Sequence, residues 1–303
     1  MKIWVLVNPR AGSGRSKSRA LAFLERVPEA ELVETERPGG AIDVARQAHR
    51  ENVDVLVAVG GDGTLQQCAT GLCIDEQGQP THPSTGLLIL PAGTGGDYRR
   101  SLSFTESVDQ AVARLAQPQL KAVDIGRLEV QLEGRRHVAA FINVVSFGIG
   151  GLTDRLVESS PKWLGGKMTY LWGAARATLL HQPTAVELWV DDQLVETAPF
   201  SNVAICLGRY FGGGMRIAPR AELSDGLFDI VTIEMGKLRT LSLSAFIYQG
   251  THLTQPGVQS YQGRTLVARA VQPERCLIDA DGEPMGTLPL RVELLPQALT
   301  LYT

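Results

Sequence analysis

The chain has 303 residues, and 29 Lys or Arg against 32 Asp or Glu give it a formal net charge of −3. This length is enough for two domains, and the charge argues against the basic surface that a nucleic-acid-binding domain needs. No stretch reaches the roughly 20 apolar residues of a membrane span, and residues 1–7 are too short for a signal peptide. Four cysteines without a CxxC pair are typical of core residues in a reducing compartment. We therefore expect a cytoplasmic protein that binds no nucleic acid and touches a membrane only peripherally.

The first 120 residues alternate between strand and helix patterns. Apolar and β-branched runs predict strands, and apolar residues at helical spacing predict helices between them. The predicted strands are 3–7, 32–35, 53–59 and 85–90, and the predicted helices are 17–26, 40–51, 65–72 and 108–116. This alternation indicates a parallel sheet, in which ligands bind at the carboxyl ends of the strands.

From about residue 125 the pattern changes to short strands separated by Asp-Asp and Asp-Gly turns, which is typical of an antiparallel β-sandwich. The predicted strands are 127–132, 138–147, 185–190, 194–196, 202–207, 229–234, 264–269, 274–279 and 290–295. Two helices, about 166–181 and 238–250, interrupt them. We place the boundary between the two textures near residues 120–126.

The strand at 53–59 runs directly into Gly60, Gly61, Asp62, Gly63 and Thr64. Glycines let a backbone approach an anion closely, and the first N–H groups of the following helix point at that anion. Asp62 would repel phosphate unless a divalent cation lay between them. This stretch therefore predicts a site for a nucleotide together with a metal ion.

The next strand, 85–90, also ends in glycines, which Asp97, Arg99 and Arg100 follow. Because neighbouring parallel strands end at the same edge, the two loops should face one crevice. The arginines are interpreted either as phosphate ligands or as solvated surface residues. The basic loop at 8–16, which matches neither a Walker A motif nor a dinucleotide fingerprint, is either a phosphate contact or an ordinary strand-to-helix connection.

These segments together resemble the diacylglycerol-kinase catalytic-domain family, which includes bacterial soluble lipid kinases, sphingosine kinases and ceramide kinases. The resemblance spans nearly the whole chain. The segment Gly60–Thr64 is shared with pyridine-nucleotide kinases, but its combination with the later segments is much more specific. The residues that carry the resemblance are Val7-Asn8-Pro9 with Gly12 and Gly14, Gly60–Thr64, 91–94 with 97–100, Asn143 with Gly148, 210–215, 219–221, 224–226 and 281–283.

The resemblance implies a nucleotide-binding α/β domain at 1–124 and a β-sandwich lipid-substrate domain at 125–289. It also implies that residues 290–303 pack back onto the first domain and that the active site is the cleft between the domains. ATP would be the co-substrate, and Mg²⁺ would act with Asp62. The residues implied to line the ATP phosphates are Asn8, Gly60, Gly61, Gly63, Thr64, Gly93 and Thr94.

Further roles follow from the same resemblance. Asp97 and Asp124 match a metal-linked hydrogen-bond network, and Asp225 matches a residue that holds a structural Mg²⁺ in some bacterial members. Asp281 matches the general base that takes the proton of the acceptor hydroxyl, and Glu283 is its acidic neighbour. From the residues alone, Asp281-Gly282 is equally a hairpin turn. Gly96 departs from the family, which usually has Asn before the aspartate of this loop.

Residues 159–172 combine Trp163 and Trp172 with Tyr170, Lys162 and Lys167. Basic and aromatic residues together suit a membrane interface, so the stretch is interpreted as part of a lipid-entry surface. The alternative is that its aromatic residues are buried against the sandwich. The lipid would be presented by a membrane or a carrier, and a homodimer is left open.

The function that we predict is phosphorylation of a hydroxyl on a diacylglycerol-, sphingoid- or ceramide-like lipid, with ATP and Mg²⁺. One rival is a pyridine-nucleotide kinase that uses the same glycine loop on NAD. The other is a nucleotide-binding regulator without catalysis, for which Gly96 is the motivation.

Overall fold

The computed structural model describes residues 1–8, 15–92, 96–102, 107–132, 134–158 and 166–303. The chain divides into two compact units: unit 1 comprises residues 1–125 and 295–303, and unit 2 comprises residues 126–294. Two strands belong to both units, β5 (Leu120–Leu132) and β15 (Glu283–Tyr302). The sequence prediction placed the boundary after residue 124 and the return of the chain at residue 290.

Unit 1 is built on a parallel sheet whose strands are almost entirely buried. β1 (Ile3–Val7) pairs with β2 (Glu31–Glu34) and β3 (Val55–Gly60), and β3 pairs with β4 (Gly86–Pro91), all in parallel. The last residues of β15 add a further parallel pairing beside β4. Apolar residues that continue without alternation suit such strands, because both faces of the sheet are covered.

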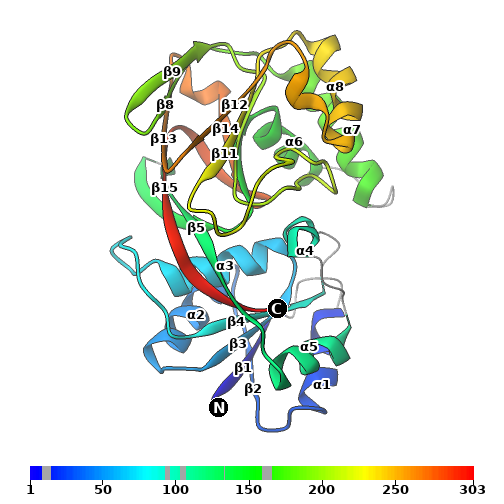
Figure 1. Ribbon diagram of the computed structural model, residues 1–303, viewed down its shortest axis with the longest axis vertical. Coiled ribbons are helices and arrows are strands. Elements are labelled where there is room, and N and C mark those ends of the chain that lie inside the picture. The colour runs from blue at the N-terminus through cyan, green and yellow to red at the C-terminus, as the bar shows by residue number, and fades with distance from the viewer. Residues whose placement is uncertain (9–14, 93–95, 103–106, 133, 159–165) are drawn as a thin grey trace. The chain divides into compact units, whose positions relative to one another are not determined.

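Helices cover the two faces of this sheet. α1 (Arg15–Leu24) and α5 (Val108–Ala116) pack on one face, where Phe23 joins the side chains of β1, β3 and β4 in a buried core. α2 (Gly40–Arg50) and α3 (Asp62–Cys73) pack against each other over the opposite face (Figure 1). A Cβ at Gly71 would collide with the carbonyl of Ile42, so this glycine lets α3 approach α2 closely. A short helix, α4 (Asp97–Leu102), follows β4.

Unit 2 is a sandwich of antiparallel strands. One layer runs in the order β12, β11, β10, β7 and β14, and continues into the first half of β15. The other layer contains β9, β8 and β13, which pairs with residues 290–293 of β15, while β6 pairs with β5. The bounds are β6 (Arg135–Phe141), β7 (Val144–Gly148), β8 (Val186–Val190), β9 (Gln193–Ala198), β10 (Asn202–Cys206), β11 (Phe228–Ile233), β12 (Val258–Gly263), β13 (Thr265–Ala270) and β14 (Leu277–Ala280).

Side chains of alternate residues in β7, β10 and β11 enter two different cores. Val145, Val203 and Ile230 face the interior of the sandwich, where Phe141 stacks on Phe228 with ring centroids 5.7 Å apart. Their neighbours in sequence form a second core with the loop at 215–221 and with α8 (Lys237–Gln249). α7 (Gly166–Leu180) packs beside α8, and α6 (Ile149–Glu158) packs beside β14 and α7 (Figure 1). Short 3₁₀ turns occupy His252–Thr254 and Pro273–Arg275.

The fold class expected from the sequence is confirmed: an α/β unit with parallel strands and a β-sandwich-like unit. All four cysteines are free and buried. Among the helices that the structure describes, none is long and apolar enough to cross a bilayer.

Several predicted elements were wrong in detail. The single strand expected at 138–147 is two strands, because the N–H groups of Ile142 and Asn143 donate to the Asp281 carboxylate instead of to a neighbouring strand. Helix α6 was missed, since Gly150 and Gly151 have poor helix propensity; both lie where a Cβ would collide with neighbouring residues. The strand expected at 290–295 is only the middle of β15. Its full length was not predicted because prolines within it argue against a continuous strand. β12 was not predicted.

We expect Asp124 to stabilise unit 1 by tying β15 to β5. Its buried carboxylate accepts a hydrogen bond of 2.7 Å from the backbone N–H of Gln297, a residue with a left-handed φ of 48°. Replacing Asp124 by Ala should lower the free energy of unfolding by about 1–3 kcal/mol, because the N–H of Gln297 loses a charged acceptor.

Urea unfolding measures this difference. Asp75→Ala is the matched control, since Asp75 also accepts backbone N–H bonds, from Gln77 and Gln79, but in an exposed turn where water replaces it. Equal losses in the two variants would contradict the role given to Asp124.

Candidate functional site

The carboxyl ends of three neighbouring strands of unit 1 lie in one row. Val7 is paired with Val59, so Asn8 follows β1 at the level where Gly60 ends β3, and Gly60 is in turn paired with Pro91 at the end of β4. In an open α/β sheet this edge is where ligands bind. The structure therefore brings the predicted residues Asn8 and Gly60–Thr64 to the same edge.

The segment Gly60–Thr64 is a strand end, a one-residue link and a helix start. Gly61 is extended, with φ −103° and ψ −168°, and α3 begins at Asp62. A Cβ at Gly60 would collide with the side chain of Thr64, so only glycine allows the helix to begin this close to the strand. The first N–H groups of a helix lack intrahelical acceptors and carry the positive end of its dipole, and together they suit an anion.

Asp62 lies in an unfavourable position for a charged carboxylate. Its Oδ2 accepts a hydrogen bond of 3.3 Å from the backbone N–H of Asp97. Burial, followed by the negative charge of Asp97, raises the pKa of Asp62 to about 6, although the backbone amide of Asp97 and the Arg99 guanidinium oppose this. Two carboxylates so close together favour either a shared proton or a cation between them.

These two carboxylates fit a magnesium ion by the chemistry of their donor atoms. Mg²⁺ prefers oxygen ligands, and it is usually held by one or two carboxylates together with substrate phosphates and water. Within the described ranges, no group of three or more His, Cys, Asp or Glu is placed to hold a metal by itself. A cation at Asp62 would therefore draw its remaining ligands from phosphate and water.

Arginines lie near the two carboxylates. Burial and the neighbouring charge of Arg100 lower the pKa of Arg99, whereas the charge of Asp62 raises it. The positive charge of Arg19 in α1 also lowers the pKa of Arg99. Arg19 donates a hydrogen bond to the carbonyl of Pro91 at the end of β4. Guanidinium groups here can neutralise phosphate charge. The sequence analysis missed Arg19, although it follows Arg15 by four residues and so shares its helix face.

Gly96, where the family usually has Asn, has a local physical explanation. The Arg99 guanidinium covers this glycine: a Cβ there would lie 2.6 Å from its Nη2 atom. A larger residue would force Arg99 to move. The absence of a side chain at Gly96 leaves room for the Arg99 guanidinium next to Asp97.

The roles expected for three other residues of unit 1 stay predictions. Gly93 and Thr94 lie outside the described residues. Asp124, expected in a network with Asp97, is buried on β5, and its carboxylate accepts a hydrogen bond from the backbone N–H of Gln297. The network assigned to Asp124 stays a prediction.

In unit 2, the Asp281 side chain is held by the backbone. Its Oδ2 accepts from the N–H of Ile142 at 2.7 Å, and its Oδ1 accepts from the N–H groups of Asn143 at 3.0 Å and Val144 at 2.9 Å. Glu283 follows two residues later as the first residue of β15 and is partly exposed. The two residues thus belong to one hairpin but have different surroundings.

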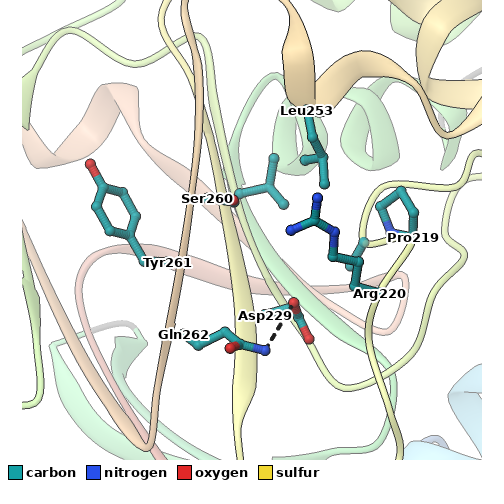
Figure 2. A pocket seen from close by; sticks show the side chains of 9 residues that line it. Pro219, Arg220, Asp229, Leu253, Ser260, Tyr261 and Gln262 are labelled. Carbon is teal, nitrogen blue, oxygen red and sulfur yellow. Dashed lines mark hydrogen bonds between the residues drawn. The ribbon is translucent and has the colours of Figure 1, made fainter.

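Asp225 lies in an exposed turn of unit 2, where its Oδ1 accepts from the N–H of Leu227 at 3.1 Å. Burial, and then the negative charge of Asp225, raise the pKa of Asp229 to about 6. Asp229 lines a cavity of about 250 Å³ on β11 and β12, where its carboxylate lies 3.5 Å from the Gln262 amide and Arg220 extends alongside (Figure 2). The sequence analysis missed Asp229, which follows the Asp-Gly turn by three residues.

The raised pKa of Asp62 makes a prediction about stability. The ordinary value is 3.8, so between pH 3.8 and about 6 the folded chain holds a proton that the unfolded chain has lost, and stability falls as the pH rises through this window. Above pH 6 the ionised carboxylate costs the fold about 3 kcal/mol. In EDTA, Asp62→Asn should therefore be more stable than the parent at pH 7.5, with the difference closing towards pH 4. Urea unfolding at several pH values measures this, and a difference independent of pH would contradict it.

Two family models match the chain. The diacylglycerol kinase catalytic domain matches residues 2–128, and the YegS C-terminal NAD kinase beta sandwich-like domain matches residues 143–303. The first match ends close to the boundary between the two units, whereas the second includes residues 295–303, which belong to unit 1.

Relatives and solved structures agree with these matches. The chain is 30% identical over 270 residues to the probable lipid kinase YegS-like of Stenotrophomonas maltophilia, covering 87% of this chain and 83% of that protein. It is 26% identical to the diacylglycerol kinase of Staphylococcus saprophyticus, covering 99% and 94%.

Two solved structures share the fold. A diacylglycerol kinase from Bacillus anthracis has a TM-score of 0.70 at 18% identity, with 99% of this chain and 96% of that chain covered. Yeast NADH kinase has a TM-score of 0.57 at 11% identity, with 99% and 82% covered. The family models and the relatives together show that the chain belongs to the diacylglycerol kinase catalytic-domain family and is a kinase, a phosphotransferase with an alcohol group as acceptor.

Proposed function

We propose that this kinase transfers the γ-phosphate of ATP, with Mg²⁺, to a hydroxyl of a diacylglycerol-, sphingoid- or ceramide-like lipid. The observation that carries the proposal is the position of Asp62 at the start of α3, with Asp97 beside it at the phosphate-binding edge of a parallel sheet. Phosphoryl transfer depends on positioning and on neutralising phosphate charge, and this edge offers both.

Unit 1 supplies the nucleotide side of the reaction in this proposal. Backbone N–H groups at Gly61–Thr64 receive phosphate oxygens, and Arg19 and Arg99 neutralise their charge. Asp62 would hold Mg²⁺, which when bound would supply electrostatic stabilisation of the transferred group. Asp97 orients Asp62 through its backbone N–H.

The lipid acceptor is proposed from the relatives. The proteins similar to this chain are named lipid kinase or diacylglycerol kinase, and the similarity covers most of each chain. We assign acceptor binding to unit 2, where the motif with Asp281 and Glu283 forms one hairpin. Asp225 would hold a structural Mg²⁺ on its exposed turn.

A pyridine-nucleotide kinase is the second candidate. Its support is the likeness to yeast NADH kinase, which at 11% identity concerns the fold alone. The relatives named for lipids are more similar in sequence, so the lipid acceptor is the better supported proposal.

The acceptor can be identified directly. The chain is incubated with radiolabelled ATP and Mg²⁺ against extracted lipid classes and NAD, and the product is identified by mass. We expect label in a phosphorylated diacylglycerol, sphingoid or ceramide lipid, and at least a hundredfold loss of label in EDTA and in Asp62→Ala, because one missing electrostatic stabiliser of this kind costs about 10²–10³ in rate.

Label in NAD would instead support the pyridine-nucleotide kinase. ATP binding without transfer to any acceptor would support the nucleotide-binding regulator.

We also propose that α7 and α8 form a surface that contacts the membrane holding the lipid. Trp172 on α7 is 59% exposed and Leu238 on α8 is 81% exposed, and Leu179, Leu180 and Phe246 extend the apolar surface. Arg176 of α7 and Lys237 and Arg239 of α8 are basic, and neither helix contains an Asp or Glu. In a chain whose net charge is −3, such a face suits anionic lipid. Of the earlier interpretation of 159–172, residues 159–165 lie outside the described residues.

Cosedimentation with vesicles tests this surface. Leu238→Glu should reduce binding to vesicles that contain phosphatidylglycerol by about tenfold or more, because burying a leucine contributes about 1.5–3 kcal/mol and the new charge repels the lipid. Val271→Glu is the matched control, since Val271 is 77% exposed in a loop outside α7 and α8. Equal binding by the two variants would contradict the proposal.

A further inference from the structure

Asp281 occupies a strained turn that joins β14 to β15. Its φ is 51° and that of Gly282 is 87°, so both central residues of this two-residue hairpin are left-handed. The pairing of Ala280 with Glu283 closes the turn. Asparagine, aspartate and glycine are the residues that such a turn favours, so the turn itself explains the backbone but leaves the direction of the side chain open.

The Asp281 side chain turns back onto the start of β7. Three consecutive backbone N–H groups, those of Ile142, Asn143 and Val144, converge on its two oxygens at 2.7–3.0 Å. The N–H of Asp281 donates in return to the carbonyl of Val144 at 2.9 Å. Successive N–H groups that surround an anion form a backbone nest, and here the anion is a side chain of the protein.

This geometry conflicts with a role in accepting a proton. An ionised carboxylate only accepts hydrogen bonds, whereas a protonated one carries an O–H donor. Three backbone N–H groups occupy three of the roughly four lone-pair positions of this carboxylate, and protonation would remove the negative charge that strengthens these hydrogen bonds. A general base needs an oxygen directed at the proton that it takes, and each oxygen of Asp281 already accepts at least one backbone hydrogen bond.

The nest is connected to the triple-glycine segment. The carbonyl of Asn143 accepts from the N–H groups of Leu207 and Gly208 at 2.8 and 3.1 Å. The side-chain amide of Asn143 donates to the carbonyl of Tyr210 at 2.9 Å. Beyond Tyr210, Phe211 and Met215 pair with each other across Gly212–Gly214, all three of which have positive φ.

We propose that Asp281 is a positioning residue that fixes residues 142–144 and, through Asn143, the segment 207–215, and that it does not take the proton of the acceptor. Its ionised side chain replaces the strand partner that Ile142 and Asn143 lack at the break between β6 and β7. The inference rests on the proposed function only in the experiments that measure lipid phosphorylation.

The chain contains a matched control. Asp191 also lies in a hairpin turn with a left-handed φ, 48°, and its Oδ1 accepts from the backbone N–H groups of Arg264 and Thr265 at 2.9 Å each. The turn connects β8 to β9, and the Asp191 side chain binds the start of β13 rather than the segments that Asp281 connects. Asp191→Asn therefore reproduces the loss of a carboxylate that holds backbone N–H groups.

The first experiment compares parent, Asp281→Asn and Asp191→Asn without any substrate. Asp281→Asn should lower the melting temperature by about 2–8 °C, as a lost buried acceptor does. By hydrogen exchange, the amides of residues 142–144 should exchange about tenfold faster in this variant only. Unchanged exchange at 142–144 would overturn the proposal whether or not the chain is a lipid kinase.

The second experiment measures phosphorylation of diacylglycerol in mixed micelles between pH 5 and 9. Asp281→Asn should reduce kcat about tenfold or more while keeping the acidic limb of the pH profile of kcat/KM at its parent position, and Asp191→Asn should keep the parent kcat. Loss of the acidic limb in Asp281→Asn would identify it as the general base and overturn the proposal.

A double variant tests the route through Asn143. If Asp281 acts through Asn143, Asn143→Ala with Asp281→Asn should lose no more activity than the more damaging single variant. If the activity loss of the double variant equals the product of the two single losses, the two residues act independently and that route is overturned. If the parent phosphorylates no lipid, the proposed function fails, and the exchange measurement still decides the role of Asp281.

Discussion

The repulsion between Asp62 and any phosphate at the same strand end is the constraint on which the account of unit 1 depends. Asp62 starts α3 at the edge where the backbone is arranged for anions, and Asp97 adds a second negative charge beside it. A neutral residue at this position would avoid the electrostatic repulsion. A carboxylate in this position is consistent only with a cation or a proton that balances it, and Mg²⁺ is the cation that accompanies ATP. The local cost to stability is thus part of the proposed chemistry.

Unit 2 shows the opposite use of a carboxylate. Asp281 is surrounded by backbone N–H groups that stabilise its charge, so no metal or proton is needed. Two aspartates that the sequence motifs present as similar acidic residues therefore lie in different electrostatic surroundings. Arg99 and backbone N–H groups compensate the charge of Asp62 only in part, whereas three backbone N–H groups surround that of Asp281.

The sequence predicts the architecture well because its signals are local. Buried strands β1, β3 and β4 are uninterrupted apolar runs, and the turn at Asp281-Gly282 follows from the residue types that a tight hairpin favours. Contacts between residues far apart in the chain could not be predicted from local sequence patterns. The break between β6 and β7 depends on Asp281, which lies 139 residues from Ile142, and the glycines of α6 hide a helix whose packing requires them. For the same reason Arg19 escaped notice, since its partner Pro91 lies 72 residues away.

The central claim is that Asp62 acts through a metal ion, and calorimetric titration of ATP in MgCl₂ and in EDTA tests it most directly. The account predicts that Mg²⁺ tightens ATP binding to the parent at least tenfold more than it tightens binding to Asp62→Asn, because the variant removes the charge that the cation has to balance. Equal dependence on Mg²⁺ in the two proteins would contradict the claim.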